Sequence, residues 1–418
     1  MLYRTMPGSD DELSILGFGA MRLPTRRGRI DEERATAQIR TLIDAGVNYV
    51  DTAFGYHGGE CEPFLARALA DGYRQRVRLA TKLPHWLVRS RPDMDHLLAE
   101  QLDRLATDRI EYYLVHALDG PTWERMRELG VCDFLALARE DGRIGRAGFS
   151  FHGEKDAFRH IVDGWDWDLC QIQYNYLDEH LQAGREGLVY AAERGLGVVV
   201  MEPLRGGFLA REAPRSVQDI WDEAPVRRSP AEWALRWVWH QPEVTLLLSG
   251  MNDEAHIAEN LRVASEAEPG SLSDKELAMI ARVADQYRSL MRVGCTGCGY
   301  CLPCPAGVDI PGCFEVQNLV QMLGQQRQAR LHYLGRVGGV LGGGGAGYAS
   351  RCVGCGRCEE RCPQKLPIRE LLKDVSREFE GPMLRLLGWI ARPALGAMGW
   401  FAVRKARRAQ RRRRSEKS

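Results

Sequence analysis

The sequence predicts an α/β protein in which a (β/α)8 TIM barrel is followed by a smaller, mainly helical domain. Three observations support this. Over the first 265 residues, short apolar runs alternate with amphipathic stretches. Eight of the apolar runs read as strands, and a cysteine-rich region follows them. At 418 residues the chain also exceeds the usual length of one domain.

The eight expected strands are short and separated by segments of helical periodicity. They are Leu16–Met21, Tyr49–Asp51, Val77–Lys82, Tyr112–His116, Arg146–Ser150, Leu169–Gln173, Gly197–Met201 and Val244–Ser249. Eight parallel strands, each followed by a helix, close a barrel. The first helix is expected over Glu32–Ala45, with Asp31 capping its start and Gly46 ending it.

The segment before the first strand, Leu2–Leu13, reads as a hairpin that turns at Pro7-Gly8 and plugs the floor of the barrel. No G-x-G-x-x-G fingerprint follows the first strand, because Gly17-Phe-Gly19 is too short. A doubly wound dinucleotide-binding fold is therefore the weaker alternative.

Polar residues cluster where neighbouring predicted strands end. Asp51 ends one strand and Tyr56 follows it, Lys82 ends the next strand, and His116 ends the third. The carboxyl ends of barrel strands form one rim, where catalytic groups gather. Each residue alone has an ordinary structural explanation, such as capping a turn or filling the core. The four together on one rim indicate a catalytic site.

Eight of the twelve cysteines form two runs with ferredoxin-like spacing. The runs are Cys295, Cys298, Cys301 and Cys304, then Cys352, Cys355, Cys358 and Cys362. The second run matches the C-x2-C-x2-C-x3-C-P pattern of bacterial [4Fe-4S] proteins, in which the last cysteine serves the other cluster. We therefore expect two [4Fe-4S] clusters, one on Cys295, Cys298, Cys301 and Cys362, the other on Cys352, Cys355, Cys358 and Cys304.

Two other uses of these cysteines fit less well. Structural zinc uses separated pairs of cysteines, whereas each run here is already a quartet. Disulfides belong to secreted chains, and nothing at the N-terminus resembles a signal peptide. The first run has two residues before its last cysteine rather than three, so the assignment of Cys304 and Cys362 is less secure than the clusters themselves. We expect a cytoplasmic protein.

The barrel region resembles the aldo-keto reductase superfamily. The motifs that carry this resemblance are Asp51-Thr-Ala-x-x-Tyr56, Thr81-Lys82, His116, Gly148-Phe-Ser150, Gln171-Ile-Gln-Tyr-Asn175, Glu202-Pro203-Leu204 and Glu259-Asn260-Leu261. The resemblance implies that Asp51, Tyr56, Lys82 and His116 are the catalytic tetrad. A Lys82 ammonium beside the phenol would lower the pKa of Tyr56 from about 10 and let it donate a proton to a carbonyl.

The resemblance also implies a nicotinamide cofactor, NADP or NAD, across the barrel mouth. Ser150 and Gln171 would bind its carboxamide, Gly206 its pyrophosphate, and Glu259 and Asn260 its adenine end. Three positions depart from the family pattern. Phe151-His152 follows Ser150 where an asparagine is usual, Met201 stands where an aromatic ring is common, and His256 replaces an arginine that often reads a 2′-phosphate.

The expected organisation has four parts: a barrel over residues 1–265, a connecting helix over 266–291, a two-cluster domain over 292–375, and an apolar helix with a basic tail over 376–418. A barrel followed by such a cluster domain resembles the iron–sulfur aldo-keto reductases. We expect an oxidoreductase that acts on a small carbonyl or alcohol and exchanges electrons through its clusters. The alternative is a non-catalytic electron-transfer subunit that uses the barrel as a docking scaffold.

Hydride transfer moves two electrons, whereas each cluster passes one. Coupling them directly needs a two-to-one adaptor such as a flavin, and no flavin motif is readable in the sequence. Three alternatives follow: the clusters serve a partner protein, an undetected cofactor bridges the two halves, or the clusters are structural. The charge distribution excludes general nucleic-acid binding by the folded part, because the net charge of +1 combines +8 on residues 404–418 with −7 elsewhere. The apolar stretch Met383–Val403, with this basic tail, predicts either a helix on an anionic membrane surface or a packed helix with a solvated tail.

Overall fold

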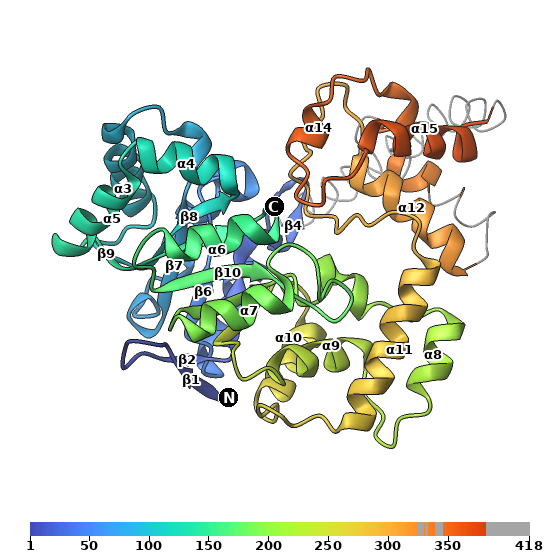
Figure 1. Cartoon of the computed structure of the whole chain (residues 1–418), viewed down its shortest axis with the longest axis horizontal. Helices are drawn as coiled ribbons and strands as arrows, with labels where there is room; N and C mark the ends of the chain where they lie inside the picture. Colours follow the sequence, from blue (N-terminus) through green and yellow to red (C-terminus); the bar gives the residue numbers. More distant parts are fainter. Residues whose placement is uncertain (324–329, 331–332, 339–345, 382–418) are drawn as a thin grey trace, which may run out of the picture. The chain divides into compact units, whose positions relative to one another are not determined.

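The computed structural model describes residues 1–323, 330, 333–338 and 346–381. The chain divides into two compact units, residues 1–285 and residues 286–418. Each unit is described by itself below, and Figure 1 labels their elements.

The first unit is the predicted (β/α)8 barrel. Its strands are β3 (Leu16–Gly19), β6 (Tyr49–Asp51), β7 (Arg78–Leu83), β8 (Ile110–Leu118), β9 (Ile144–Phe151), β10 (Leu169–Gln173), β11 (Gly197–Met201) and β12 (Leu246–Ser249). All eight pair in parallel, and β12 pairs with β3 to close the ring. Every predicted strand is thus confirmed, with ends shifted by a few residues.

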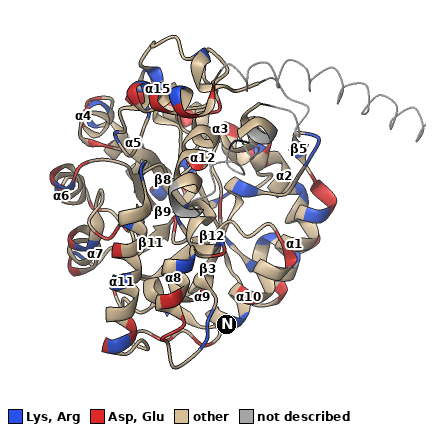
Figure 2. Ribbon diagram, turned by 90° about the vertical axis from the view of Figure 1, so that its right-hand side faces the viewer, with Lys and Arg blue, Asp and Glu red and all other residues tan. Residues whose placement is uncertain are grey.

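Helices surround the ring of strands and cover its apolar outer face. They are α1 (Glu32–Asp44), α2 (Cys61–Ala68), α3 (Arg91–Arg104), α4 (Gly120–Glu128), α5 (Val131–Glu140), α6 (Lys155–Asp163), α7 (Gly184–Glu193), α8 (Arg215–Trp221), α9 (Pro230–Trp239) and α10 (Glu254–Ala264). Charged residues lie along these helices, α1, α4, α6 and α7 among them (Figure 2). The strands read as apolar runs because they are buried on both faces.

The first helix begins and ends where the sequence predicts, but its expected cap is wrong in one detail. Asp31 occupies the N-cap position, yet its side chain makes no capping hydrogen bond. Its Oδ2 atom instead lies 3.6 Å from the Nε atom of Arg26, which ends strand β4 (Thr25–Arg26). Gly46 follows the helix with a φ of +99°, which an L side chain rarely adopts.

A hairpin closes the floor of the barrel, as predicted. Strands β1 (Tyr3–Thr5) and β2 (Glu12–Ser14) pair antiparallel ahead of β3. Met6 and Leu13 are fully buried in one apolar cluster with Tyr49 and Leu169 from the barrel strands. The fit is tight, because a Cβ atom at Gly197 would lie 2.2 Å from the Met6 sulfur.

Helix α11 (Asp274–Leu290) lies within the range expected for a connecting helix, and the boundary between the two units falls inside it. The described part of that unit is helical, with α12 (Ile310–Leu323), η6 (Tyr333–Val337), η7 (Ala349–Arg351), α14 (Arg357–Glu360) and α15 (Ile368–Phe379). The predicted segment Met383–Val403 and the basic tail lie outside the described residues. Among the residues that are described, no helix is long and apolar enough to cross a membrane.

Candidate functional site

A buried ion pair joins the ends of two neighbouring strands. Asp51 is the last residue of β6, and Lys82 lies near the end of β7. The Lys82 Nζ atom donates to Asp51 Oδ2 at 2.5 Å and to the carbonyl oxygen of Thr52 at 2.8 Å. Both side chains are almost completely buried. Burial raises the pKa of Asp51, and its bond to Lys82 opposes that shift.

The phenol of Tyr56 lies close to this ion pair. Tyr56 opens the 3-10 helix η2 (Tyr56–Gly59), which follows β6. The Lys82 Nζ atom lies 5.3 Å from the centre of the Tyr56 ring. The His116 ring is 6.2 Å away, nearly perpendicular to the phenol. The structure therefore brings together all four side chains that the sequence singled out.

His116 is an electrically neutral member of this group. It is buried near the end of β8, and burial, with the nearby Lys82 cation, holds its pKa well below the usual value of about 6.5. A neutral imidazole at pH 7 can donate one hydrogen bond and accept another. Such a group can orient a polar oxygen without adding a second positive charge next to Lys82.

Trp86 is a component of the rim that sequence reasoning missed. It lies in the 3-10 helix η4 (His85–Leu87) just after β7, and its ring centre is 5.2 Å from that of His116. Trp86 is 48 % exposed although it is a large apolar side chain. An exposed ring beside a buried polar group is suited to contact a ligand. The sequence signal that could have identified Trp86 is its position: it lies two residues after Pro84, just past the predicted strand that ends in Lys82.

Arg104 is a second residue that the sequence did not reveal. It ends α3, and its Nη2 atom donates to the carbonyl oxygens of Phe54 and Gly59, which lie on either side of Tyr56. Its guanidinium also lies 4.4 Å from the Phe54 ring centre and 3.4 Å from the carboxylate of Glu62. These contacts fasten both ends of the segment that carries Tyr56.

Glu62 extends this support to the strand that carries Lys82. It is fully buried, and its Oε1 atom accepts from Thr81 Oγ1 at 2.7 Å and from Gln101 Nε2 at 2.7 Å. Gln101 Nε2 also donates to the carbonyl oxygen of Lys82 at 3.1 Å. Helices α2 and α3 therefore hold the end of β7, which carries Lys82, through a shared polar network.

Three predicted cofactor-binding side chains lie at the ends of adjacent strands. Ser150 lies on β9, Gln171 on β10 and Met201 at the end of β11. Ser150 Oγ accepts from the Ala117 amide at 2.7 Å, and Gln171 Nε2 lies 3.6 Å from the Met201 sulfur. Among the described residues, the buried Gln171 Oε1 atom has no hydrogen-bond partner. A carboxamide N–H2 group would satisfy that acceptor, so this position fits a nicotinamide.

Gly206 has a left-handed backbone conformation in the segment that follows β11. It belongs to η5 (Arg205–Ala210), where Gly206 and Gly207 have φ of +67° and +90°. A Cβ at Gly207 would meet no atom within 4 Å, so its backbone is accessible to a close ligand. The buried Arg205, which no sequence pattern revealed, anchors this segment. Its Nε atom lies 2.9 Å from Asp178 Oδ2.

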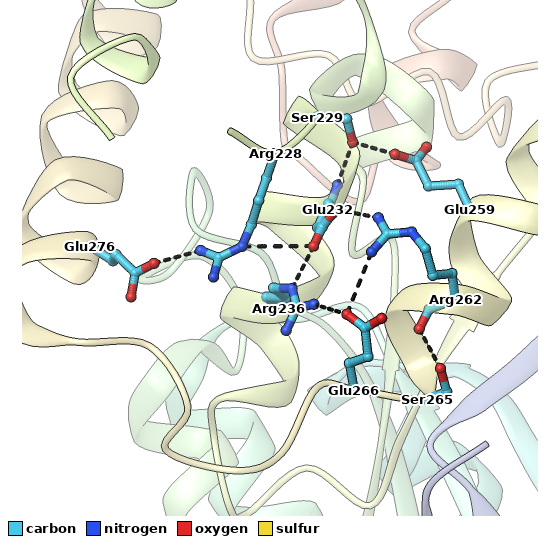
Figure 3. Close-up of polar contacts among 9 residues, drawn as sticks. All are labelled: Arg228, Ser229, Glu232, Arg236, Glu259, Arg262, Ser265, Glu266 and Glu276. Carbon is cyan, nitrogen blue, oxygen red and sulfur yellow. Dashed lines mark hydrogen bonds and ion pairs between the residues drawn. The ribbon is translucent and has the colours of Figure 1, made fainter. Parts of the chain in front are cut away.

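The two residues expected at the adenine end lie together on α10 but contact the protein itself. Glu259 Oε1 accepts from Ser229 Oγ at 2.5 Å (Figure 3). The buried Asn260 donates from Nδ2 to Ser249 Oγ at 2.9 Å and to the Met251 sulfur at 3.3 Å. Asn260 thus ties α10 to the end of β12.

A network of ion pairs lies beside Glu259 and centres on Glu232 (Figure 3). Arg236 donates to Glu232 at 2.8 Å and to Glu266 at 2.7 Å, and Arg262 bonds the same two carboxylates. Arg228 pairs with Glu276 at 2.5 Å. All three arginines therefore already have carboxylate partners, and the Glu259 carboxylate adds a further negative charge beside them.

The structure brings the second unit's cysteines together in two groups. A cavity of about 270 Å³ is lined by five cysteines, which are Cys301, Cys304, Cys352, Cys355 and Cys358. Burial raises the pKa of the Cys301 thiol, and the neighbouring thiols of Cys298, Cys295 and Cys362 raise it further. Cys304 therefore lies with the cysteines of the second run, and Cys362 lies near those of the first run.

The backbone around these cysteines and the donor set fit a cluster better than a single ion. Gly354 and Gly356, on either side of Cys355, have φ of +71° and +79°, which lets the chain curl around its sulfurs. Eight cysteine thiols spaced in two quartets are the donor set that two [4Fe-4S] clusters use.

Comparisons with known proteins cover both units. Residues 15–285 match the model of the aldo/keto reductase family, and residues 294–366 match that of the 4Fe-4S dicluster domain. A structure of an aldo-keto reductase from Bacillus halodurans in its holo form is 26 % identical, with a TM-score of 0.57, covering 68 % of this chain and 96 % of its own. A Klebsiella pneumoniae aldo-keto reductase in complex with NADPH is 23 % identical, with a TM-score of 0.56 and the same coverage.

Among curated sequences, the NADH-specific methylglyoxal reductase of Escherichia coli is 23 % identical, over 66 % of this chain and 96 % of its own length. The match to each of these three relatives falls short of this chain's full length and nearly spans theirs. In the second unit of this chain, residues 294–366 match the 4Fe-4S dicluster domain.

The contacts of Arg104 predict that it positions the segment around Tyr56. Replacing Arg104 with Met removes its bonds to Phe54 and Gly59 while keeping a long side chain. We expect amide hydrogen exchange in residues 54–60 to become about tenfold faster or more, because a charged hydrogen bond contributes about 1.5 kcal/mol or more. Mass spectrometry of that peptide measures the change.

Arg40→Met is a matched control. Arg40 also donates to backbone carbonyls, those of Ala68 and Ala70, and pairs with Asp71, but it lies on α1 away from Tyr56. It should leave exchange in residues 54–60 unchanged, and Arg104→Lys should restore part of the protection. Equal exchange in Arg104→Met and the unmodified protein would show that Arg104 does not hold this segment.

Proposed function

This chain belongs to the aldo/keto reductase family, and we propose that its barrel reduces a small carbonyl compound, or oxidises the corresponding alcohol, with a nicotinamide cofactor. It is an oxidoreductase of the aldo/keto reductase type, with a C-terminal 4Fe-4S dicluster domain. The observation that carries the proposal is the buried Lys82–Asp51 pair, at 2.5 Å, beside the Tyr56 phenol and the neutral His116.

Each member of the tetrad has a distinct role in this proposal. Tyr56 gives its proton to the carbonyl oxygen during reduction. Lys82 favours the phenolate that remains, because an adjacent cation stabilises a negative charge. Asp51 keeps the ammonium in place, and His116 orients the carbonyl oxygen by a hydrogen bond. When bound, the nicotinamide supplies the hydride.

The rim beyond the tetrad would position the cofactor and substrate. Gln171, with its unsatisfied Oε1, and Ser150 would bind the nicotinamide carboxamide, with Met201 beside the ring. Gly206 would approach the pyrophosphate, and the exposed Trp86 would contact the substrate. A complete tetrad beside such a rim is not required of a docking scaffold, so the scaffold alternative is the weaker one.

The role of Tyr56 predicts the effect of removing its hydroxyl. Tyr56→Phe should lower turnover of a small aldehyde about 10²- to 10⁴-fold, the usual contribution of a general acid. Affinity for the reduced dinucleotide, followed by fluorescence, should not change. Steady-state kinetics with a panel of aldehydes and ketones provides the measurement.

Tyr190→Phe serves as the control, because the Tyr190 hydroxyl bonds only surface partners, Asp163 and Arg194, among the contacts seen. It should keep full activity. Full activity in Tyr56→Phe would exclude Tyr56 as the acid, and no binding of either dinucleotide to the folded protein would favour the scaffold alternative.

We also propose that the cofactor is NADH rather than NADPH. The adenine end, placed by family resemblance near Glu259 and Asn260, is bordered by arginines that already pair with carboxylates. Arg34 likewise pairs with Glu254, the first residue of α10, at 2.5 Å. A 2′-phosphate would add up to two negative charges next to Glu259, with no uncommitted arginine among these residues to meet it.

Binding titrations test this preference directly. NADH should bind at least about tenfold more tightly than NADPH, a difference of about 1.4 kcal/mol. His256→Arg adds an exposed cation on α10 and should narrow or reverse the preference, whereas His256→Gln should not. Tighter binding of NADPH to the unmodified protein would contradict the proposal.

For the second unit we propose two [4Fe-4S] clusters with the crossed ligand sets. The ligands would be Cys295, Cys298, Cys301 and Cys362 for one cluster, and Cys304, Cys352, Cys355 and Cys358 for the other. Bound clusters supply one-electron transfer, so this unit would exchange electrons with a redox partner protein. A bound flavin finds no support in the comparisons. Thiolate ligands need a reducing compartment, which fits the cytoplasm.

Iron content and redox coupling test this part of the proposal. Anaerobically purified protein should contain about eight irons, four per cluster. Dithionite-reduced clusters, freed of excess reductant, should regain their oxidised absorbance when NAD⁺ is added together with a flavin, because the flavin collects single electrons from the clusters and passes two of them, with one proton, to NAD⁺ to form NADH. Cys298→Ser should impair this exchange. Stoichiometric zinc, or clusters that stay reduced with and without added flavin, would contradict it.

A further inference from the structure

The cysteine group around Cys355 lies at an exposed, basic part of the second unit. Cys355 is exposed and Val353 is 73 % exposed, whereas Cys362 of the other group is buried. The cavity enclosed by this group is also lined by Arg357, Arg361 and Arg369, and by no carboxylate of the described residues.

A groove of about 890 Å³ opens next to that cavity. Helix α15 forms one wall, and residues 349–354 form the other. Cys352 lines both the cavity and the groove, so the groove leads to a cysteine of this group. A protein surface seated in the groove would therefore come directly against Cys352.

The sequence of α15 explains why its groove wall is basic. Ile368, Leu372, Val375 and Phe379 are buried at helical spacing and fasten the helix to the core of the unit. Arg369, Lys373 and Arg377 recur every four residues and so share another face, which lines the groove.

The charges around the cavity and the groove are unequal. Five cations and two carboxylates line them together: Arg357, Arg361, Arg369, Lys373 and Arg377, against Glu359 and Glu370. Glu359 is already paired with Arg369 at 2.7 Å. Arg377 pairs with Asp374 at 2.6 Å, but its side chain is 77 % exposed, and such an exposed ion pair is weak, so Arg377 can still meet a partner. Lys373 and Arg377 lie in the groove but do not line the cysteine cavity, so they can be changed without altering the cavity wall.

We propose that this groove is the docking site of a small acidic electron-carrier protein. The inference rests on the proposed clusters and adds the site and charge of the partner. Carboxylates on the carrier would meet Lys373 and Arg377, and the exposed Val353, which lines the adjoining cavity, would provide apolar contact beside the groove. Opposite charge steers such encounters and fixes their orientation. The chain's own residues 404–418, with nine basic side chains and one acid, repel this surface and do not suit it as an occupant.

The test measures binding of an oxidised, acidic [2Fe-2S] ferredoxin to the iron-loaded, full-length protein by anaerobic calorimetry. Lys373→Glu with Arg377→Glu changes the groove by four charge units. We expect this double variant to weaken binding at least tenfold at low salt, and the difference to shrink at high salt because ions screen exposed charges. A basic carrier such as cytochrome c should not bind the unmodified groove.

Lys155→Glu with Arg215→Glu is the control, since both side chains are exposed and lie on the barrel. Residues 404–418 are also basic and would attract an acidic protein in both double variants. Comparing the two variants therefore isolates the contribution of the groove. Equal ferredoxin affinity in both variants, or no binding to iron-loaded protein, would overturn the inference. Self-association lost only in the groove variant would also overturn it, because a second copy would then be the occupant. Iron-free protein would instead contradict the proposed clusters.

Discussion

The candidate active site depends on keeping two opposite charges out of water at the end of β6 and β7. Removing a carboxylate and an ammonium from water costs about several kcal/mol each, and their attraction offsets this only with good geometry. The 2.5 Å contact between Lys82 and Asp51, with a second bond from Lys82 to Thr52, meets that requirement. The parallel pairing of β6 with β7 sets the distance, so the barrel is the condition for the pair.

The surrounding network follows from the same constraint. Glu62 and Gln101 hold the strand that carries Lys82, while Arg104 fastens the segment that carries Tyr56. In the second unit the candidate ligands are supported by apolar packing rather than by a polar network, because the core of that unit packs directly against the cysteines. Without bound metal, those thiols face one another in an apolar setting, so cluster binding and stability of this unit should be coupled.

The sequence predicted the parts of the fold that depend on local pattern. Apolar runs identified all eight strands, and strand ends identified Asp51, Lys82 and His116, because a closed parallel barrel places those ends on one rim. Arg104 could not be found in this way. Its partner Gly59 is 45 residues away, and a helix-terminal arginine carries no signal for such a contact. The Asp31 cap failed because its carboxylate had an alternative partner, Arg26.

The pH dependence of carbonyl reduction tests most directly whether the Lys82–Asp51 pair enables Tyr56 to act as the acid. The double variant Asp51→Asn with Lys82→Met removes both charges and leaves no unpaired buried ion. In the unmodified protein, the rate should fall as pH rises through a value below the ordinary tyrosine pKa of about 10. In the variant that fall should move to higher pH, with a rate about 10²- to 10⁴-fold lower. The same profile and rate in both proteins would contradict the account.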